Sequence, residues 1–166
     1  AIVQAAPDTL LVVVGDAPAD SLHASVQTRD SIQAVADAAG IGQHLRFLGV
    51  ITDPQELACA YESASLHIFP VRQLPGDPEG FGMVAIEAAA HGLPTVAFAT
   101  GGIVDAVAEG LSGHLVAPGD YVALAQAALR VLAAPGPDAW QASSRSFAAQ
   151  FAWPMLGEKM KTVLWC

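Results

Sequence analysis

The 166-residue sequence has few positive charges: seven Lys and Arg stand against sixteen Asp and Glu, which gives a net charge of −9. Nucleic acids and anionic lipid surfaces attract clustered Lys and Arg, so this balance argues against either as a partner of this chain. Cysteine is also scarce. Cys59 and Cys166 lie too far apart in the sequence to suggest a disulfide framework or a metal site. We therefore expect a protein of the reducing cytoplasm.

Long apolar runs are missing as well, and none approaches the length of a membrane span. Hydrophobic residues nevertheless make up 53% of the chain and charged residues 14%. This composition excludes disorder and indicates a packed α/β interior with nearly continuous apolar strands. The length suits one ordinary domain.

Strand and helix patterns alternate along the chain. Strands are expected at residues 9–14, 45–48, 66–69, 95–99 and 113–116. Helices are expected at residues 31–39, 54–64, 82–90, 103–109, 121–132, 139–150 and 154–164. Repeated β–α units with short loops specify a Rossmann-like, three-layer α/β fold with a parallel sheet. Residues 1–6 resemble the last turns of a helix, so we expect a domain whose first strand is missing. Residues 1–150 would form this domain, and residues 151–166 a closing helix attached to it.

Two glutamates, Glu79 and Glu87, stand eight residues apart in the segment EGFGMVAIE. The Gly-Phe-Gly turn opens what we interpret as a buried helix, because Glu87 is surrounded in sequence by Met, Val, Ile and Ala. We expect no solvated face for Glu87. Burying an unpaired carboxylate costs several kcal/mol, so hydroxyl groups or a cation should meet it.

The chemistry of this segment suits a nucleotide diphosphate-sugar. A helix N-terminus has free N–H groups and a partial positive charge, which favour a phosphate. Gly80 and Gly82 let the backbone approach such a group, and Gly80 is free to take positive φ. An ionised carboxylate only accepts hydrogen bonds, so a vicinal diol is its natural partner. The helix rises about 7 Å between Gly82 and Glu87, which leaves room for a sugar, a diphosphate and a ribose.

The segment EGFGMVAIEAAAHGLPTVAFATGG, followed by DAV and GLSGHLVAPGD, resembles the C-terminal donor-binding domain of family 4 (group 1) retaining glycosyltransferases of the GT-B fold. VVVGD and LRFLGVITDPQEL upstream fit the same pattern, so the resemblance covers nearly the whole chain. The last helix is similar to that of the phosphatidylinositol mannosyltransferase-like branch. The family's Arg and Lys on the first strand and its loop have no counterpart here.

The resemblance implies roles for particular residues. Glu79 would bind hydroxyls of the donor sugar at the catalytic centre, and Glu87 would bind the ribose diol. The main chain of Ile51 would read the base, with Asp53 nearby. The diphosphate-sugar would lie against the turn and the first N–H groups of the helix, at Gly80, Phe81, Gly82, Met83 and Val84.

The reaction implied is transfer of a sugar with retention of configuration, with no metal and no other cofactor. The donor would be GDP-mannose or a UDP-sugar. The acceptor would bind to an N-terminal domain that this chain lacks, and that domain could bring the enzyme to the inner face of a membrane. We therefore expect an inactive fragment that self-associates through apolar residues of its last helix, including Trp153 and Trp165.

Other interpretations remain open. The chain could be a degenerate, non-catalytic nucleotide-sugar-binding module or a nucleotide-sugar epimerase of GT-B fold. A phosphorylase would need a Schiff-base lysine, and neither Lys159 nor Lys161 is suitably placed. Glu79 could be a solvated loop residue, and Glu87 a structural acid paired with a buried Arg. The pair Gly101-Gly102 could approach the donor or simply form a tight turn.

Further residues have simpler structural interpretations. Tyr61 is expected to be a partly buried core aromatic, and His67 a satisfied histidine in the core or at an edge. His91 would interact with the end of its helix.

Overall fold

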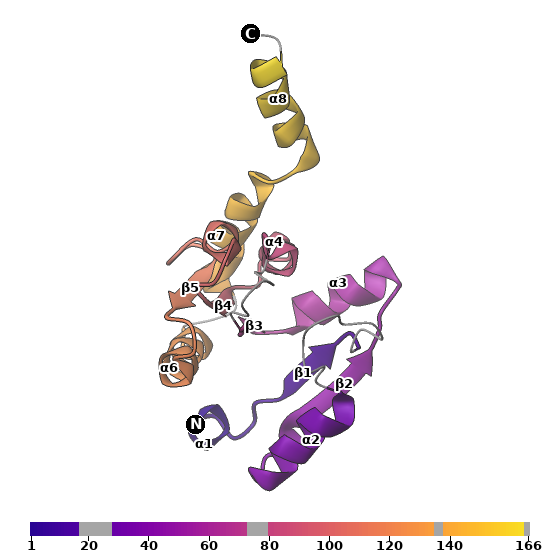
Figure 1. Cartoon of the computed structure of the whole chain (residues 1–166), viewed down its shortest axis with the longest axis vertical. Helices are drawn as coiled ribbons and strands as arrows, with labels where there is room; N and C mark the ends of the chain where they lie inside the picture. Colours follow the sequence, from indigo (N-terminus) through magenta and orange to yellow (C-terminus); the bar gives the residue numbers. More distant parts are fainter. Residues whose placement is uncertain (17–27, 73–79, 135–137, 165–166) are drawn as a thin grey trace. The chain divides into compact units, whose positions relative to one another are not determined.

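A computed structural model describes residues 1–16, 28–72, 80–134 and 138–164 of the chain (Figure 1). The chain divides into two compact units, Ala1–Cys59 and Ala60–Cys166, which are called unit 1 and unit 2 below. Each unit contains its own parallel β-sheet. The predicted α/β class with parallel strands is confirmed.

Unit 1 contains a two-stranded sheet. Its elements are α1 (Ile2–Ala5), β1 (Leu11–Val14), α2 (Arg29–Ala38), η1 (Gly42–His44), β2 (Leu45–Gly49) and the larger part of α3 (Pro54–Ser63). The strands β1 and β2 are parallel, with Leu11 opposite Leu45, and α2 packs against β2. Thr28 caps α2, because its side chain accepts a hydrogen bond from the N–H of Ser31.

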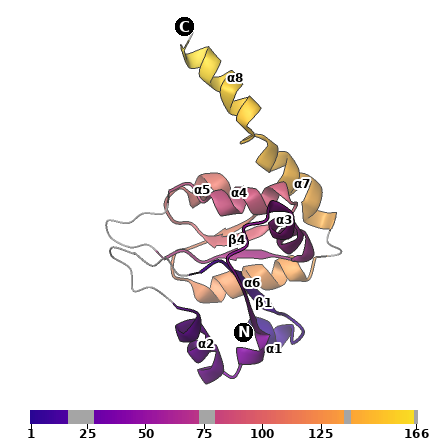
Figure 2. The ribbon, with the colours of Figure 1, turned by 90° about the vertical axis from the view of Figure 1, so that its right-hand side faces the viewer.

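Unit 2 contains a three-stranded parallel sheet in the order β3-β4-β5. Its elements after α3 are β3 (His67–Phe69), α4 (Met83–Ala90), β4 (Thr95–Phe98), α5 (Ile103–Ala106), β5 (Gly113–Val116), α6 (Tyr121–Leu132), α7 (Asp138–Ala149) and α8 (Trp153–Leu164). Helices α4 and α5 lie on one face of the sheet, and α6 lies on the other (Figure 2). This is the predicted three-layer arrangement.

The central strand β4 supplies side chains to both faces of the sheet, as the twofold repeat of a strand requires. Val96 and Phe98 belong to the apolar cluster under α6, whereas Ala97 belongs to the cluster under α4. All four residues of β4 are buried, which fits a parallel strand covered on both faces.

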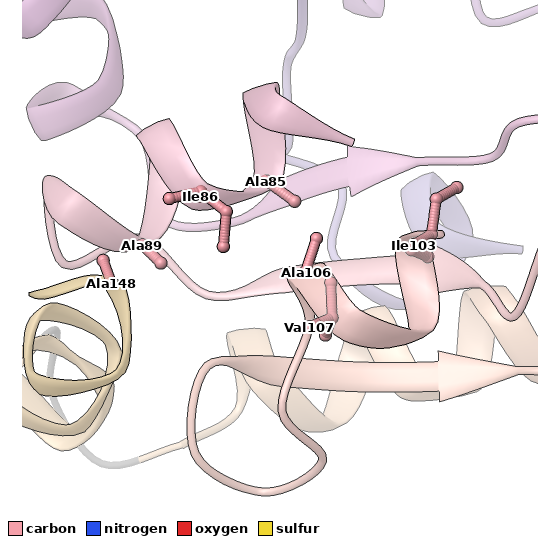
Figure 3. Close-up of a cluster of buried hydrophobic side chains, with 8 residues drawn as sticks. Ala85, Ile86, Ala89, Ile103, Ala106, Val107 and Ala148 are labelled. Carbon is pink, nitrogen blue, oxygen red and sulfur yellow. The ribbon is translucent and has the colours of Figure 1, made fainter. Parts of the chain in front are cut away.

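The cluster under α4 joins four elements, α4, α5, α7 and the strand β4 (Figure 3). Small side chains of α4 meet residues of α5 and its C-cap, together with Ala148 of α7. The labelled members are Ala85, Ile86, Ala89, Ile103, Ala106, Val107 and Ala148. The alanines let α7 and the sheet approach α4 closely. This contact fixes which face of α4 points inward.

The last helix, α8, carries exposed apolar side chains. Trp153 is 82% exposed, and Met155 and Met160 are also exposed. The expected self-association through this helix stays a prediction, and Trp165 lies outside the described residues. The expected division at residue 150 also stays a prediction. Among the helices in the described part of the chain, none has the length and apolar character needed to cross a membrane.

Candidate functional site

The turn into α4 is built around Gly82. Gly82 is the N-cap of α4 with φ +76°, and no side chain caps this helix. A Cβ on Gly82 would lie 3.4 Å from Phe69 Cε1 and 3.5 Å from Ile103 Cγ1, so the turn is packed as well as left-handed. Gly80 is free to take positive φ but does not use this freedom: the left-handed residue is Gly82, where the chain turns into the helix.

The start of α4 offers backbone donors to an external group. Helix geometry leaves the first N–H groups, including those of Met83 and Val84, without partners inside the helix. Met83 is 58% exposed and Val84 37% exposed. The helices α2 and α6 differ, since Thr28 and Asp120 cap them with side-chain oxygens. The N-terminus of α4 can therefore hold an anion of modest size.

The turn after β4 packs directly against this segment. A Cβ on Gly102 would overlap the carbonyl oxygen of Gly80 and lie 3.1 Å from Phe81 Cα. Gly101-Gly102 thus forms a tight strand-to-helix turn, one of the two interpretations left open. The turns after β3 and β4 meet at the carboxyl ends of their strands, where open α/β sheets bind ligands.

Thr100 lies in the same turn and is a residue that the sequence did not reveal. Its side chain is 3% exposed, and its Oγ1 has no hydrogen-bond partner among the described residues. Buried hydroxyl groups are usually paired. A single Thr before two glycines gives no sequence signal for this property.

Glu87 lies on the exposed face of α4, so the expectation that it has no solvated face was wrong. The buried residues of α4 are Ala85, Ile86, Ala88 and Ala89. Glu87 is four residues after Met83 and three after Val84, and this spacing places the three on one face of a helix. Glu87 therefore lies on the same exposed face of α4 as the first two residues of the helix.

The hydroxyl of Tyr61 donates a hydrogen bond of 3.1 Å to Glu87 Oε2. Both residues belong to unit 2. Burial, the negative charge of Glu87 and this hydrogen bond raise the pKa of Tyr61 from 10.0 to about 12. Tyr61 is partly buried, as expected, but its contact with Glu87 was not predicted. The alternative of a buried Arg beside Glu87 has no support among the described residues, where Tyr61 is the recorded partner.

The ring of Tyr61 stacks on His91, with 5.3 Å between ring centroids and 8° between ring planes. His91 is the C-cap of α4, and its backbone N–H donates to the carbonyl oxygens of Glu87 and Ala88. His91 Nδ1 lies 3.3 Å from Glu62 Oε1. The expected position of His91 at a helix end is confirmed, and the contact with Glu62 links α3 to α4.

The residues proposed to read the base lie in unit 1. Ile51 is partly buried and precedes α3. Asp53 Oδ1 accepts a hydrogen bond of 2.8 Å from the N–H of Gln55, so Asp53 caps the start of α3. The sequence Asp-Pro is typical of such a helix start, with Pro54 at the first helical position. A role of either residue in binding a base stays a prediction.

Glu79 lies outside the described residues. Its assignment to the donor sugar stays a prediction.

His67 is a partly buried histidine of β3 with a hydrogen-bond partner, within the range that was expected. Its Nδ1 lies 3.0 Å from Oγ1 of the buried Thr95. Burial lowers the pKa of His67 from 6.5 to about 4. His67 is therefore neutral at pH 7, and this matters for stability rather than for the site.

A cavity of about 400 Å³ lies at the amino ends of β3 and β4. Its wall includes Ser65, Leu93, Pro94 and Trp140, and it shares Tyr61 and His91 with the contacts described above. The glycine turns lie at the carboxyl ends of the same strands. The cavity therefore does not contain the N-terminus of α4, and we assign the candidate site to the turns.

Comparison with known proteins identifies the family. The family described as "Glycosyl transferases group 1" matches residues 1–134. A D-inositol 3-phosphate glycosyltransferase of Mycobacterium avium (strain 104) is 36% identical over 144 residues, which cover 86% of this chain and 32% of the relative. A second protein of that name, from Catenulispora acidiphila, is 39% identical over 126 residues, covering 74% of this chain and 27% of the relative. The chain spans about a third of the length of such relatives.

Solved structures show the same architecture. Sucrose-phosphate synthase from Thermosynechococcus elongatus superposes with a TM-score of 0.77 and 31% identity, over 98% of this chain and 39% of that chain. Anabaena Alr3699/HepE in complex with UDP-glucose gives a TM-score of 0.71 and 25% identity, over 95% of this chain and 41% of that chain. These neighbours confirm the predicted GT-B resemblance. The chain belongs to the group 1 glycosyltransferases.

Proposed function

We propose that this chain is the donor-binding domain of a retaining glycosyltransferase and that it binds a nucleotide diphosphate-sugar. A UDP-sugar is favoured over GDP-mannose, because a structural neighbour at 25% identity was solved with UDP-glucose. The relatives named D-inositol 3-phosphate glycosyltransferases support a phosphorylated polyol as acceptor of the whole enzyme. The acceptor would bind outside this chain.

The observation that carries the proposal is the exposed face of α4. It begins at the glycine turn, where the N–H groups of Gly82, Met83 and Val84 suit a diphosphate. It continues to Glu87, whose carboxylate can accept hydrogen bonds from two adjacent ribose hydroxyls. The rise of about 7 Å between Gly82 and Glu87 matches the separation of a diphosphate and its ribose.

The remaining roles complete the proposal. Glu79 would hold hydroxyls of the donor sugar beyond the diphosphate, and the main chain of Ile51 would contact the base with Asp53 nearby. The leaving diphosphate would gain negative charge as the bond to the sugar breaks. N–H groups aimed at that charge stabilise it without reorganisation. The departing phosphate would assist the acceptor on the same face of the sugar, so the reaction would need neither a protein nucleophile nor a metal ion.

The test is isothermal titration calorimetry of UDP and GDP with the chain and with its Glu87→Gln variant. Glu87→Gln keeps the side-chain shape but removes the charge that strengthens hydrogen bonds from the ribose. We expect the Kd for the preferred nucleotide to rise about 10- to 100-fold. Glu56→Gln, at an exposed glutamate in the first turn of α3, is the matched control and should leave the Kd unchanged. Equal affinities for wild type and Glu87→Gln, or no binding by wild type, would contradict the proposal.

A further inference from the structure

Glu87 is an exposed side chain that nevertheless has a defined partner. An exposed glutamate samples many rotamers, and fixing it on a ligand costs conformational entropy. Here the Tyr61 hydroxyl donates to Oε2 over 3.1 Å. No other side chain in the described part of the chain has a recorded hydrogen bond to the Glu87 carboxylate. The carboxylate has about four lone-pair sites, so it can keep this bond and still accept two more.

Tyr61 is itself held in place by its neighbours. Its ring stacks on His91 at 5.3 Å, and His91 Nδ1 lies 3.3 Å from Glu62 Oε1. Glu62 follows Tyr61 on α3, whereas His91 ends the helix that carries Glu87. The Arg145 side chain also donates to the His91 carbonyl oxygen at 3.4 Å. The hydroxyl of Tyr61 is therefore fixed relative to α4 by contacts that do not involve Glu87.

The hydroxyl remains a donor at neutral pH. Burial and the adjacent Glu87 charge raise the pKa of Tyr61 to about 12. A protonated phenol beside a carboxylate donates to it, and hydrogen bonds to charged groups are the stronger kind. The pair therefore stays intact at physiological pH.

We propose that Tyr61 is a positioning residue, which holds the Glu87 carboxylate in the orientation that accepts the ribose diol of the nucleotide. This inference rests on the proposed function and adds a residue of α3 to its site. The preset carboxylate loses less conformational freedom when ribose binds, and preorganisation of this kind raises affinity. A purely structural role for Tyr61, as a strut between α3 and α4, is the alternative.

A pair of ligands separates the two roles. UDP has the ribose diol, whereas 2′,3′-dideoxy-UDP has the same base and diphosphate without either hydroxyl. If Tyr61 acts through Glu87, Tyr61→Phe affects only the ligand that bears the diol. If Tyr61 is only a strut, Tyr61→Phe keeps the stacked ring and changes neither affinity, or disturbs the helices and weakens both ligands alike.

The experiment measures Kd by calorimetry for both ligands with wild type, Tyr61→Phe and Glu87→Gln. We expect Tyr61→Phe to raise the Kd for UDP about 5- to 10-fold and to leave that for dideoxy-UDP unchanged. Tyr121→Phe is the matched control, since Tyr121 lies at the start of α6 with its ring against Phe98. It should change neither value. An unchanged UDP affinity in Tyr61→Phe, or an equal loss for both ligands, would overturn the inference.

The Glu87→Gln arm separates this inference from the proposed function. If wild type prefers UDP over dideoxy-UDP, and Glu87→Gln removes the preference while Tyr61→Phe keeps it, only the role of Tyr61 fails. If wild type shows no preference, the ribose contact of the proposed function fails. Tyr61→Phe retains the stacked ring, and circular dichroism checks its fold. Should it unfold, His91→Leu removes the stack but leaves the hydroxyl, and it must weaken UDP binding without affecting dideoxy-UDP.

Discussion

The contact between the two glycine turns can be tested by Gly102→Ala. The added Cβ would overlap the Gly80 carbonyl oxygen, and it would also lie 2.9 Å from the Gly80 carbonyl carbon and 3.1 Å from Phe81 Cα. All three atoms belong to the backbone, so no side-chain rotation relieves the clash. Gly102 has φ −75°, which alanine adopts freely. The whole effect is therefore steric, and one of the turns must move.

The magnitude follows from two opposing contributions. Overpacking of a filled site costs about 1–3 kcal/mol. Replacing glycine by alanine also lowers the conformational entropy of the unfolded chain, which stabilises the folded state by about 0.4–1 kcal/mol. We expect the free energy of unfolding to fall by about 1–2 kcal/mol. Nucleotide affinity should fall as well, because the displaced turn carries the first N–H groups of α4.

The assay is urea unfolding followed by circular dichroism, combined with calorimetry of UDP binding. Gly80→Ala is the matched control for stability, because its Cβ would meet no atom within 4 Å and its φ lies outside the left-handed region. Its free energy of unfolding should stay within about 0.5 kcal/mol of wild type. Equal stability of Gly102→Ala and Gly80→Ala would refute the packing of the two turns.

Two further predictions concern stability. The pKa of His67 is about 4 in the folded chain and 6.5 in the unfolded chain. As pH falls, His67 is therefore protonated in the unfolded chain at a higher pH than in the folded chain, which favours unfolding. The free energy of unfolding should drop between pH 6.5 and 4 by up to about 3 kcal/mol, and urea titrations of His67→Gln should lack this part of the pH dependence. Ile103 is fully buried beside Gly82, so Ile103→Ala should cost about 2–5 kcal/mol in the same assay. Val104→Ala changes a neighbouring side chain that is 48% exposed, and it should cost less than about 1 kcal/mol. Equal losses of unfolding free energy in Ile103→Ala and Val104→Ala would contradict the assigned core.

Local chemistry made much of the fold predictable. Short apolar runs with β-branched residues mark strands such as β4, and Asp53 and Asp120 cap helices where side-chain oxygens can reach free N–H groups. The start of α4 after Gly82 also followed from the sequence. These features depend on residues a few positions apart, so no tertiary information is needed.

The error at Glu87 has a physical cause. Helix α4 has apolar residues on every face, so periodicity does not identify the buried one. Packing against the sheet, α5 and α7 selects the face with Ala85 and Ala89, and Glu87 is left outside. The partner of Glu87 was equally hidden. Tyr61 is 26 residues away on another helix, and only the packed structure brings them together.

The most direct test of the central claim is a nuclear magnetic resonance titration of the isotope-labelled chain with UDP. Amide shifts of Gly82, Met83 and Val84 report whether a diphosphate binds at the start of α4. We predict that these three amides show the largest saturable changes and that Glu87→Gln weakens the response. Changes confined to the cavity around Leu93 and Trp140, with the three amides unaffected, would contradict the assignment of the nucleotide site.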